Sequence, residues 1–473
     1  MIRSLHILVS LLLILIALPG LGQQQPDSKN QLSPEAFISI VRSYHPVARQ
    51  ADLALDLAEA NLTASRAGFD PLFTMNAERK TFDGRNYYDF VRPELRIPTW
   101  YGIEVKAGLE NNMGDYLNPE VSKGRSSYLG ISVPVGKGLV MDKRRAALKQ
   151  ARIFRDQSKA ERILAINDLL YEAYSSYWNW VAAWAAYNLV SEQVRLNESR
   201  YAFVKTTFEQ GDRPAIDTTE ALAQLQTFQL AQNEAWMRFR GAGLDLSNFM
   251  WMANDSPYYL PPNVRPDPVW EKLSTDTVRL PVLEDLLSTA RIAHPKLTVY
   301  DHKLKSLDVE KRLKFQENLP YLNLKGNLLN KGYDVFDKGT WAYYSNNYKI
   351  GFDLSVPLRL SQGRGEYRAA KIKIQTTELD RAQTGLEIGN KIRNSFNELA
   401  TLQSQVRLAG QNSQSYQRLL SGEEMKFRAG ESSLFLVNSR ETKALEARQK
   451  YAELRAKFFK SYYGLEWAAG QLR

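Results

Sequence analysis

The stretch YKIGFDLSVPL (residues 348–358) alternates strictly between two kinds of side chain. A period of two in hydrophobicity predicts a β-strand with one apolar and one polar face. The apolar face carries Ile350, Phe352, Leu354, Val356 and Leu358, and the polar face carries Lys349, Gly351, Asp353 and Ser355. Such a strand suits either a soluble sheet packed on a core or a membrane barrel that is apolar outside and polar inside.

Residues 101–110 alternate in the same way, and four further segments follow the pattern more loosely, at residues 72–79, 91–97, 128–135 and 321–329. Their polar faces carry charges, and polar loops such as NNMGDYLNPEVSKGRSS (residues 111–127) join them. Charged inner faces and long polar loops favour the membrane barrel over the soluble sheet. The side chains that we expect to face the barrel lumen are Glu104, Lys106, Glu110, Lys325, Lys349 and Asp353.

The first residues of the chain indicate export. Arg3 is followed by an unbroken apolar run over residues 7–18, and Gly20 and Gly22 are small residues placed for cleavage before Gln23. This pattern predicts a secretory signal peptide over residues 1–22, because the apolar run is too short to span a bilayer. No later segment offers about 18 consecutive apolar residues, so we expect no transmembrane helix.

Composition narrows the possible functions. The chain of 473 residues has no cysteine, four histidines and a formal net charge of +10. Disulfides and thiolate chemistry are therefore excluded, and export makes nucleic acid an improbable partner for the dispersed Lys and Arg. No phosphate-binding loop, metal-ligand spacing or catalytic triad motif is evident. We therefore expect no enzyme and no cofactor.

The sequence contains two copies of one plan. Ser39, Arg42, His45, Pro46, Asp52 and Leu55 match Ser288, Arg291, His294, Pro295, Asp301 and Leu304 in the same spacing. Later matches in the same order are SVP (132–134 and 355–357), RAA (145–147 and 368–370) and FEQG with FRAG (208–211 and 427–430). We predict a first structural repeat at residues 31–255, a Pro-rich linker at 256–280 and a second repeat at 281–473.

Each copy is expected to begin with one helix of about 35 residues (33–68 and 280–318) that a Pro ends. Strands follow, and then a long helical run (142–210 and 365–429) and a last helix. A helix of nearly 70 residues needs a coiled coil or bundle that buries one stripe. Tyr177, Trp180, Trp184 and Tyr187 recur at helical spacing and are interpreted as core packing.

These elements constrain how the chain meets a membrane. The helices are too charged for lipid, so a strand region that begins and ends on their side must cross an even number of times. A few strands cannot close a barrel, and open strand edges are not tolerated in lipid. The predicted fold class is an α+β membrane protein, with a long α-helical coiled-coil barrel and a transmembrane β-barrel shared between subunits.

The duplicated HP dipeptides, the SVP strand ends with the helix starts that follow, and the helix breaks FEQGDRPAID (208–217) and FRAGESSLFL (427–436) resemble the TolC family of outer-membrane efflux and secretion channels. The resemblance covers essentially the whole mature chain. It implies a homotrimer in the outer membrane of a Gram-negative bacterium, with a helical tunnel across the periplasm.

The resemblance also implies partners. Such a channel is the passive exit duct of a tripartite efflux pump or a type I secretion system. It docks to a periplasmic adaptor (membrane fusion) protein, and an inner-membrane pump of the RND, ABC or MFS type supplies the energy. The alternative that the sequence leaves open is a periplasmic coiled-coil adaptor or scaffold protein. The transported substrate is not evident from the sequence.

Two features depart from the family pattern. The family has four strands per subunit, whereas the first copy here holds four plausible strands by itself (72–81, 87–97, 101–111 and 126–136), which makes six per chain. The extra hairpin could cross the membrane or stand outside it. Acidic, Tyr and Arg residues that latch the tunnel entrance in the family are also replaced in the second copy, by Phe427, Ser432, Leu436 and Ser439.

The break in the first copy, FEQGDRPAIDTTE (208–220), has two interpretations. Gly211 suits a helix C-terminus and the acids suit the next helix start, so the segment could be an ordinary turn. By resemblance, Asp217 and Glu220 would instead form an acidic ring at the periplasmic entrance of the trimer, with Arg213 pairing to a neighbouring chain. The resemblance assigns adaptor docking to the helix tips, namely Gln210, Gly211, Asp212, Ala429, Gly430 and Glu431.

Overall fold

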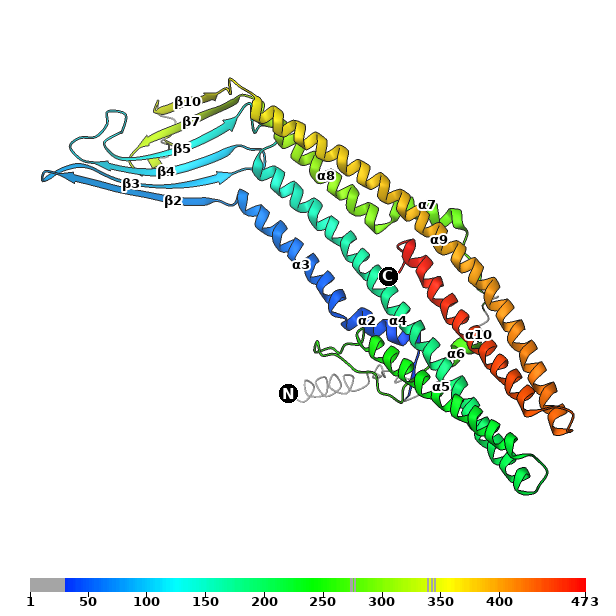
Figure 1. The fold of residues 1–473 in the computed structure, drawn as a ribbon. Coiled ribbons are helices and arrows are strands. Elements are labelled where there is room, and N and C mark those ends of the chain that lie inside the picture. The colour runs from blue at the N-terminus through cyan, green and yellow to red at the C-terminus, as the bar shows by residue number, and fades with distance from the viewer. Residues whose placement is uncertain (1–29, 273–274, 276–277, 338–339, 342, 344–345) are drawn as a thin grey trace, which may run out of the picture.

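Long helices lie side by side and lead from one end of the molecule to a single β-sheet at the other (Figure 1). The computed structural model describes residues 30–272, 275, 278–337, 340–341, 343 and 346–473. The predicted signal peptide at residues 1–22 lies outside the described residues. The elements alternate as helices, strands and helices, twice over.

The first set of elements comprises α2 (Pro34–Tyr44), α3 (Pro46–Arg66), β2 (Leu72–Phe82), β3 (Arg85–Pro98), β4 (Glu104–Met113), β5 (Gly124–Pro134), α4 (Lys143–Glu209) and α5 (Ala215–Ser247). The second comprises α7 (Leu283–Ala293), α8 (Pro295–Gln316), β7 (Tyr321–Lys331), β10 (Tyr348–Ser355), α9 (Ser361–Arg428) and α10 (Leu434–Ala468). The order of elements agrees with two copies of one plan, while the exact repeat boundaries stay a prediction.

The segment between the two sets is partly ordered against the body of the molecule. β6 (Arg265–Pro266) pairs in parallel with β1 (Gln31–Leu32), and α6 (Val269–Lys272) follows it. The Arg455 guanidinium of α10 donates hydrogen bonds to the carbonyls of Trp270 and Glu271, at 2.6 and 2.9 Å. A small hairpin of β8 (Phe336–Asp337) and β9 (Thr340–Trp341) lies between β7 and β10 in the chain.

The single first helix predicted for each copy is wrong, because each is two helices that meet at the HP dipeptide. His45 and His294 are extended (ψ 133° and 127°) and end α2 and α7, while Pro46 and Pro295 begin α3 and α8. Proline disfavours the helical conformation in the residue before it and is tolerated in the first helical turn. Each His ring then caps the new helix, its Nδ1 accepting from the backbone N–H two residues on at 3.2 Å.

The two long predicted helices are confirmed as α4, with 67 residues, and α9, with 68. At 1.5 Å per residue each is about 100 Å long. α4 packs against α3 and α8 near the sheet and against α5 and α10 farther away, and α9 packs against α8 and then α10. α4 thus has two successive pairs of shorter partners along its length, and α9 has α8 followed by α10.

The aromatic stripe of α4 is core packing, as predicted. Tyr177 and Trp180 are fully buried, and Trp180, Trp184 and Tyr187 all pack on the Phe239 ring of α5. The Tyr177 ring also stacks on Phe37 of α2. This cluster joins α4 to both α2 and α5. Among the described residues, no helix is both long enough and apolar enough to cross a bilayer.

The six long strands form one antiparallel sheet in the order β10-β7-β5-β4-β3-β2. The predicted strands are therefore confirmed as elements, although β10 ends at Ser355, before the SVP proline, and β4 begins at Glu104. The sheet joins strands of both copies where β5 pairs with β7. Its outer strands, β2 and β10, pair on one side only among the described strands.

Candidate functional site: a polar sheet face and a helical entrance

The sheet has one polar face and one apolar face. Register places Lys106 of β4 beside Gly130 of β5, Gly130 beside Asn327 of β7, and Asn327 beside Lys349 of β10, so these residues share one face. The alternate positions on the same strands are apolar and include Val105, Leu109, Ile131, Leu324, Leu328, Ile350, Phe352 and Leu354. Most of these apolar side chains are exposed in the single chain. A sheet of this kind suits lipid on one side and water on the other.

All six residues predicted to face a lumen lie on the polar face. Lys325 and Asp353 form an ion pair between β7 and β10. Glu110 accepts a hydrogen bond from Asn112 at 3.3 Å, and Glu104 pairs at 3.0 Å with Arg144 in the first turn of α4. The Glu104 pair therefore joins the sheet to the helical part. Lys106, Glu110, Lys325 and Lys349 line a hollow of about 620 Å³ over this face.

Four further residues on the polar face were not predicted from the sequence. They are Arg92, Glu94 and Arg96 of β3 and Tyr128 of β5. Glu94 accepts hydrogen bonds from the Tyr128 hydroxyl and from Arg96, the latter at 2.9 Å, and the Arg92 Nε donates to the Asn112 Oδ1 at 3.0 Å. The alternation in VRPELRI could have found the three β3 residues, because Arg92, Glu94 and Arg96 are spaced by two.

The opposite end of the molecule carries two helical tips of the same construction. Gly211 and Gly430 adopt left-handed backbone angles, with φ of 83° and 78°. Each ends a long helix with a pair of backbone hydrogen bonds typical of a Schellman cap; Asp212 N–H reaches the Thr207 carbonyl at 3.0 Å, and Glu431 N–H reaches the Lys426 carbonyl at 2.9 Å. The predicted docking residues, Gln210, Gly211, Asp212, Ala429, Gly430 and Glu431, are all exposed.

The predicted entrance residues are bonded within their own chain. Arg213 pairs at 3.2 Å with Asp217, four residues on, and its guanidinium lies 4.1 Å from the centroid of the Phe427 ring. Glu220 accepts a hydrogen bond at 3.1 Å from Asn438 of α10. Within the chain Arg213 has a partner one helical turn away, because Asp217 lies in the first turn of α5. The pairing of Arg213 with a neighbouring chain stays a prediction. These contacts link the first-copy tip to α9 and α10.

The second-copy tip lacks an equivalent acidic cluster. Ser433 caps α10 by accepting from the Leu436 N–H at 3.4 Å, and the Ser432 hydroxyl donates to Glu423 of α9. Leu436 is exposed, and Phe427 is buried against Arg213. Contacts of Ser432 and Ser433 and the Phe427 ring thus hold the second-copy tip, while Leu436 and Ser439 are exposed.

A buried charge network above the tips was not predicted. Glu441 of α10 is 1% exposed; it accepts from Arg200 at 2.7 Å and from Asn197 at 3.0 Å, both on α4. Arg200 also reaches Glu424 of α9 at 3.3 Å. The sequence carries no local signal for this network. Its α4 residues are more than 200 residues away from their partners on α9 and α10, and all three helices are rich in other charges.

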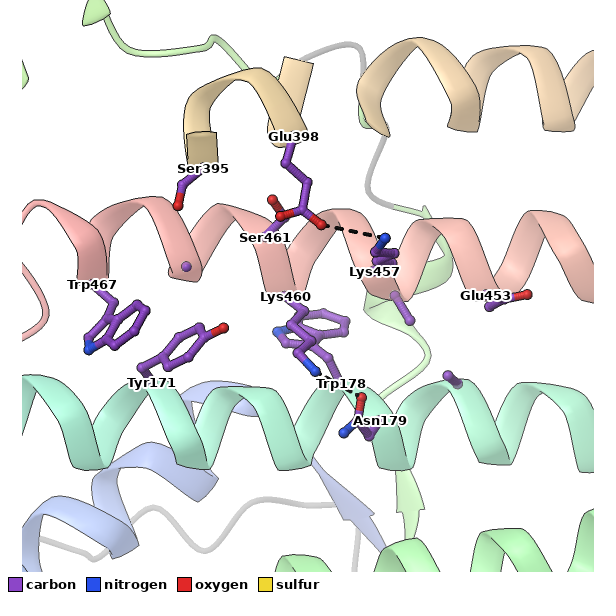
Figure 2. Close-up of a pocket in the computed structure, with 13 residues that line it drawn as sticks. Tyr171, Trp178, Asn179, Ser395, Glu398, Glu453, Lys457, Lys460, Ser461 and Trp467 are labelled. Atoms are coloured by element: carbon purple, nitrogen blue, oxygen red, sulfur yellow. Dashed lines mark hydrogen bonds and ion pairs between the residues drawn. The ribbon is translucent and has the colours of Figure 1, made fainter. Parts of the chain in front are cut away.

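A cavity of about 390 Å³ lies between α4, α9 and α10 (Figure 2). Trp178 and Tyr171 of α4 and Trp467 of α10 contribute its aromatic rings, and Tyr171 stacks on Trp467 with 4.2 Å between centroids. Lys457 of α10 pairs with Glu398 of α9 at 3.4 Å across it. Over the described ranges no group of His, Asp or Glu side chains is arranged to hold a metal ion.

Comparison with known proteins agrees with this geometry. The family model for outer membrane efflux proteins matches residues 286–471, from α7 to beyond the end of α10. No curated protein sequence matches the chain. Solved structures with the same fold include the Campylobacter jejuni CmeC outer membrane channel, with TM-score 0.64 and 16% identity over 93% of this chain and 86% of that one.

Two further structures are similar over nearly their whole length. The outer membrane protein VceC of Vibrio cholerae aligns with TM-score 0.63 and 13% identity over 92% of this chain and 96% of its own. The open-state MtrE outer membrane channel of Neisseria gonorrhoeae aligns with TM-score 0.63 and 15% identity over 93% and 89% of the two chains. At these identities the likeness establishes the fold.

The amphipathic sheet and the long helices define the fold class as that of the outer membrane channels CmeC, VceC and MtrE. Within that class, residues 286–471 carry the sequence of the outer membrane efflux protein family, which confirms the resemblance predicted from the motifs. The first copy repeats the same elements in the same order. Both copies therefore have the fold of outer membrane channels, and the family match lies in the second copy.

Proposed function

We propose that three copies of this chain form a passive channel-tunnel, the exit duct of a tripartite efflux pump or a type I secretion system. The observation that carries the proposal is the six-stranded sheet with a charged face and an apolar face, which runs directly into helices of about 100 Å. A sheet with free edges needs neighbours before it can sit in lipid. A closed trimer supplies those neighbours by rotation.

The tips at Gly211 and Gly430 are the proposed docking points for a periplasmic adaptor. They are exposed, they have the same backbone geometry, and they lie farthest from the sheet (Figure 1). An adaptor bound there would connect the tunnel to an inner-membrane pump of the RND, ABC or MFS type, which supplies the energy. Transport through the duct then requires no catalytic step by this chain.

The tunnel entrance is proposed to lie at Asp217 and Glu220. One inward-facing acid per chain becomes a ring of three in a trimer, and such a ring favours cations at a constriction. The contacts of Glu220 with Asn438 and of Arg213 with Phe427 support a further role, because they hold the α5 tip against α9 and α10. Separating the two helical pairs would break these contacts.

A test of the entrance is the single-channel conductance of an Asp217→Ala/Glu220→Ala variant in planar bilayers. We expect a changed conductance and a weaker preference for cations than in the wild type. Glu284→Ala is a matched control, since Glu284 is an exposed acid in the first turn of α7, away from the tips. A double variant with unaltered conductance and selectivity would refute the acidic entrance.

The alternative function, a periplasmic adaptor or scaffold protein, does not account for this sheet. Coiled-coil hairpins alone would explain α4, α5, α9 and α10, but six strands with an exposed apolar face would be a liability in water. Native mass in detergent separates the two functions, since the channel predicts a particle of three chains. A monomer would contradict the shared barrel.

A further inference from the structure

The sheet of one chain ends in two free edges. β2 is bonded only to β3, and β10 only to β7, among the described strands. Every residue of β2 and of β10 is exposed in the single chain. In lipid, no water is present to bond the unpaired backbone N–H and C=O groups of such an edge, so both edges must find partners.

We propose that β2 of one copy pairs with β10 of the next, so that all six strands of each chain enter the membrane and three chains close an 18-stranded barrel. The proposal rests on the homotrimer of the proposed function and adds the strand count and the identity of the seam. The competing arrangement keeps the β2–β3 hairpin outside the barrel wall. In that arrangement β4 would be the edge strand at the seam.

The two faces of the sheet continue into the part of the β2–β3 hairpin nearer the helices, whereas toward the turn Arg79 and Asp89 pair at 3.9 Å on positions of the apolar face. Phe73 and Met75 of β2 and Leu95 and Ile97 of β3 lie on the apolar face, and all four are exposed. Asn76 of β2 lies on the polar face with Arg92, Glu94 and Arg96 of β3. A hairpin that stood in water outside the wall would have no reason to keep an exposed apolar face in register with the rest of the sheet.

Side-chain bonds on the polar face join the hairpin to the other strands. Tyr128 of β5 extends across β4 to donate to Glu94 of β3, and it can do so because position 108 of β4 is glycine. A Cβ at Gly108 would lie 2.5 Å from the Tyr128 ring. A backbone position kept free for a side chain that spans three strands indicates that β3, β4 and β5 share one wall.

The turns place both ends of the hairpin where barrel strands would end. Asp83 and Gly84 both have positive φ, 51° and 73°, and form the tight turn between β2 and β3 at the end away from the helices. At the helical end, Trp100 in the β3–β4 turn stacks on Phe69 beside α3, with 4.2 Å between centroids. β2, with 11 residues, is as long as the roughly 9–11 residues that a membrane strand needs, and β3, with 14, is longer.

A wider exit follows from the strand count. Barrel diameter grows roughly linearly with strand number, so three chains of six strands form a pore roughly half as wide again as three chains of four. Barrels of about 16–18 strands enclose an aqueous channel. The narrowest point of this channel is then set by the helical end, and the barrel adds a wide, charged vestibule.

The seam can be tested by disulfide cross-linking, since the chain has no cysteine of its own. A Met75→Cys substitution in β2 is combined in turn with Ile350→Cys, Phe352→Cys and Leu354→Cys in β10, all on the apolar face. The matched series replaces Met75→Cys by Ala107→Cys, on the same face of β4. Copper phenanthroline with oxygen oxidises neighbouring thiols in outer-membrane fractions, and non-reducing gels report covalent trimers.

We expect the β2 series to give a covalent trimer with at least one β10 position and the β4 series to give none. Cross-links from Ala107→Cys to β10, or a trimeric native mass without any link from Met75→Cys, would overturn the 18-stranded barrel and leave the trimeric duct intact. A monomeric native mass would instead overturn the proposed function itself. A second measurement uses neutral polymers of graded size, and the proposal predicts entry of larger polymers from the sheet end than from the tip end.

Discussion

At the scale of single residues, the Arg200–Glu441 pair is the clearest case of a contact that fixes helix positions. Removing one partner of a buried ion pair leaves an uncompensated charge and costs about 3–5 kcal/mol, whereas replacing both by apolar residues is often nearly neutral. We expect Arg200→Ala to lower the thermal midpoint of the helical circular dichroism signal in detergent by several degrees.

The control for this prediction is an exposed ion pair on α10, the helix that carries Glu441. Lys450 and Glu453 of α10 lie 3.1 Å apart with side chains 58% and 60% exposed, so Lys450→Ala should change the stability by less than about 0.5 kcal/mol. An Arg200→Met/Glu441→Leu double variant should recover most of the midpoint. A single variant as stable as the wild type would show that the buried pair does not hold α4 to α10.

His294 makes the stability depend on pH. Burial lowers the pKa of its imidazole from 6.5 to about 4, because the charged form loses its hydration, and the neutral Nδ1 is needed to cap α8. Above about pH 6.5 the ring is neutral in both folded and unfolded chains. As the pH falls from there to about 4, only the unfolded chain takes up a proton, so stability falls by about 1.4 kcal/mol per pH unit.

This prediction is checked with His294→Asn, which keeps a capping acceptor but does not titrate. Between about pH 7 and pH 5 the wild type should lose about 2 kcal/mol more stability than the variant. The comparison uses thermal midpoints of both proteins in the same detergent. Parallel losses in the two proteins would mean that His294 does not contribute to the pH dependence.

At the scale of elements, the helical tips depend on glycine in the left-handed conformation. Gly430 has φ of 78°, whereas Gly422 lies inside α9 with no atom within 4 Å of an added Cβ. We expect Gly430→Ala to destabilise the tip by about 1 kcal/mol and Gly422→Ala to stabilise α9 by about 0.5–1 kcal/mol. The thermal midpoints should therefore move in opposite directions, and shifts of the same sign would contradict the cap assignment.

Much of the secondary structure was predictable from periodicity. The strict alternation of residues 348–355 and 101–110 specifies strands by itself, and the long run without Gly or Pro before FEQG specifies a long helix. The run before FRAG contains no Pro and is also one long helix. The HP breaks were also visible in the sequence, and the prediction of one helix across them gave too little weight to the proline.

Contacts between distant parts of the chain were beyond prediction. The bond from Tyr128 over Gly108 to Glu94 depends on the register of three strands, and the Arg200–Glu441 pair depends on which helix faces which. Neither register nor helix pairing has a signature in one local stretch of sequence. The entrance residues Asp217 and Glu220 were found by resemblance, and their role stays a proposal.

At the scale of the whole molecule, the central claim is that the polar face of the sheet lines a conducting pore. Lys106 and Val105 are neighbours on β4, an inner strand of the six-stranded sheet, and they lie on opposite faces. Because the chain has no cysteine, each can be replaced by the only thiol in the protein. A charged, water-soluble thiol reagent reaches a thiol in a water-filled lumen and does not reach one in lipid.

The most direct measurement is therefore the single-channel conductance of Lys106→Cys and Val105→Cys proteins in planar bilayers before and after this reagent. The account predicts stepwise changes in the Lys106→Cys channel, up to one for each of three chains, and no change in the Val105→Cys channel. Modification through Val105→Cys with none through Lys106→Cys, or an unaltered current in both, would contradict it.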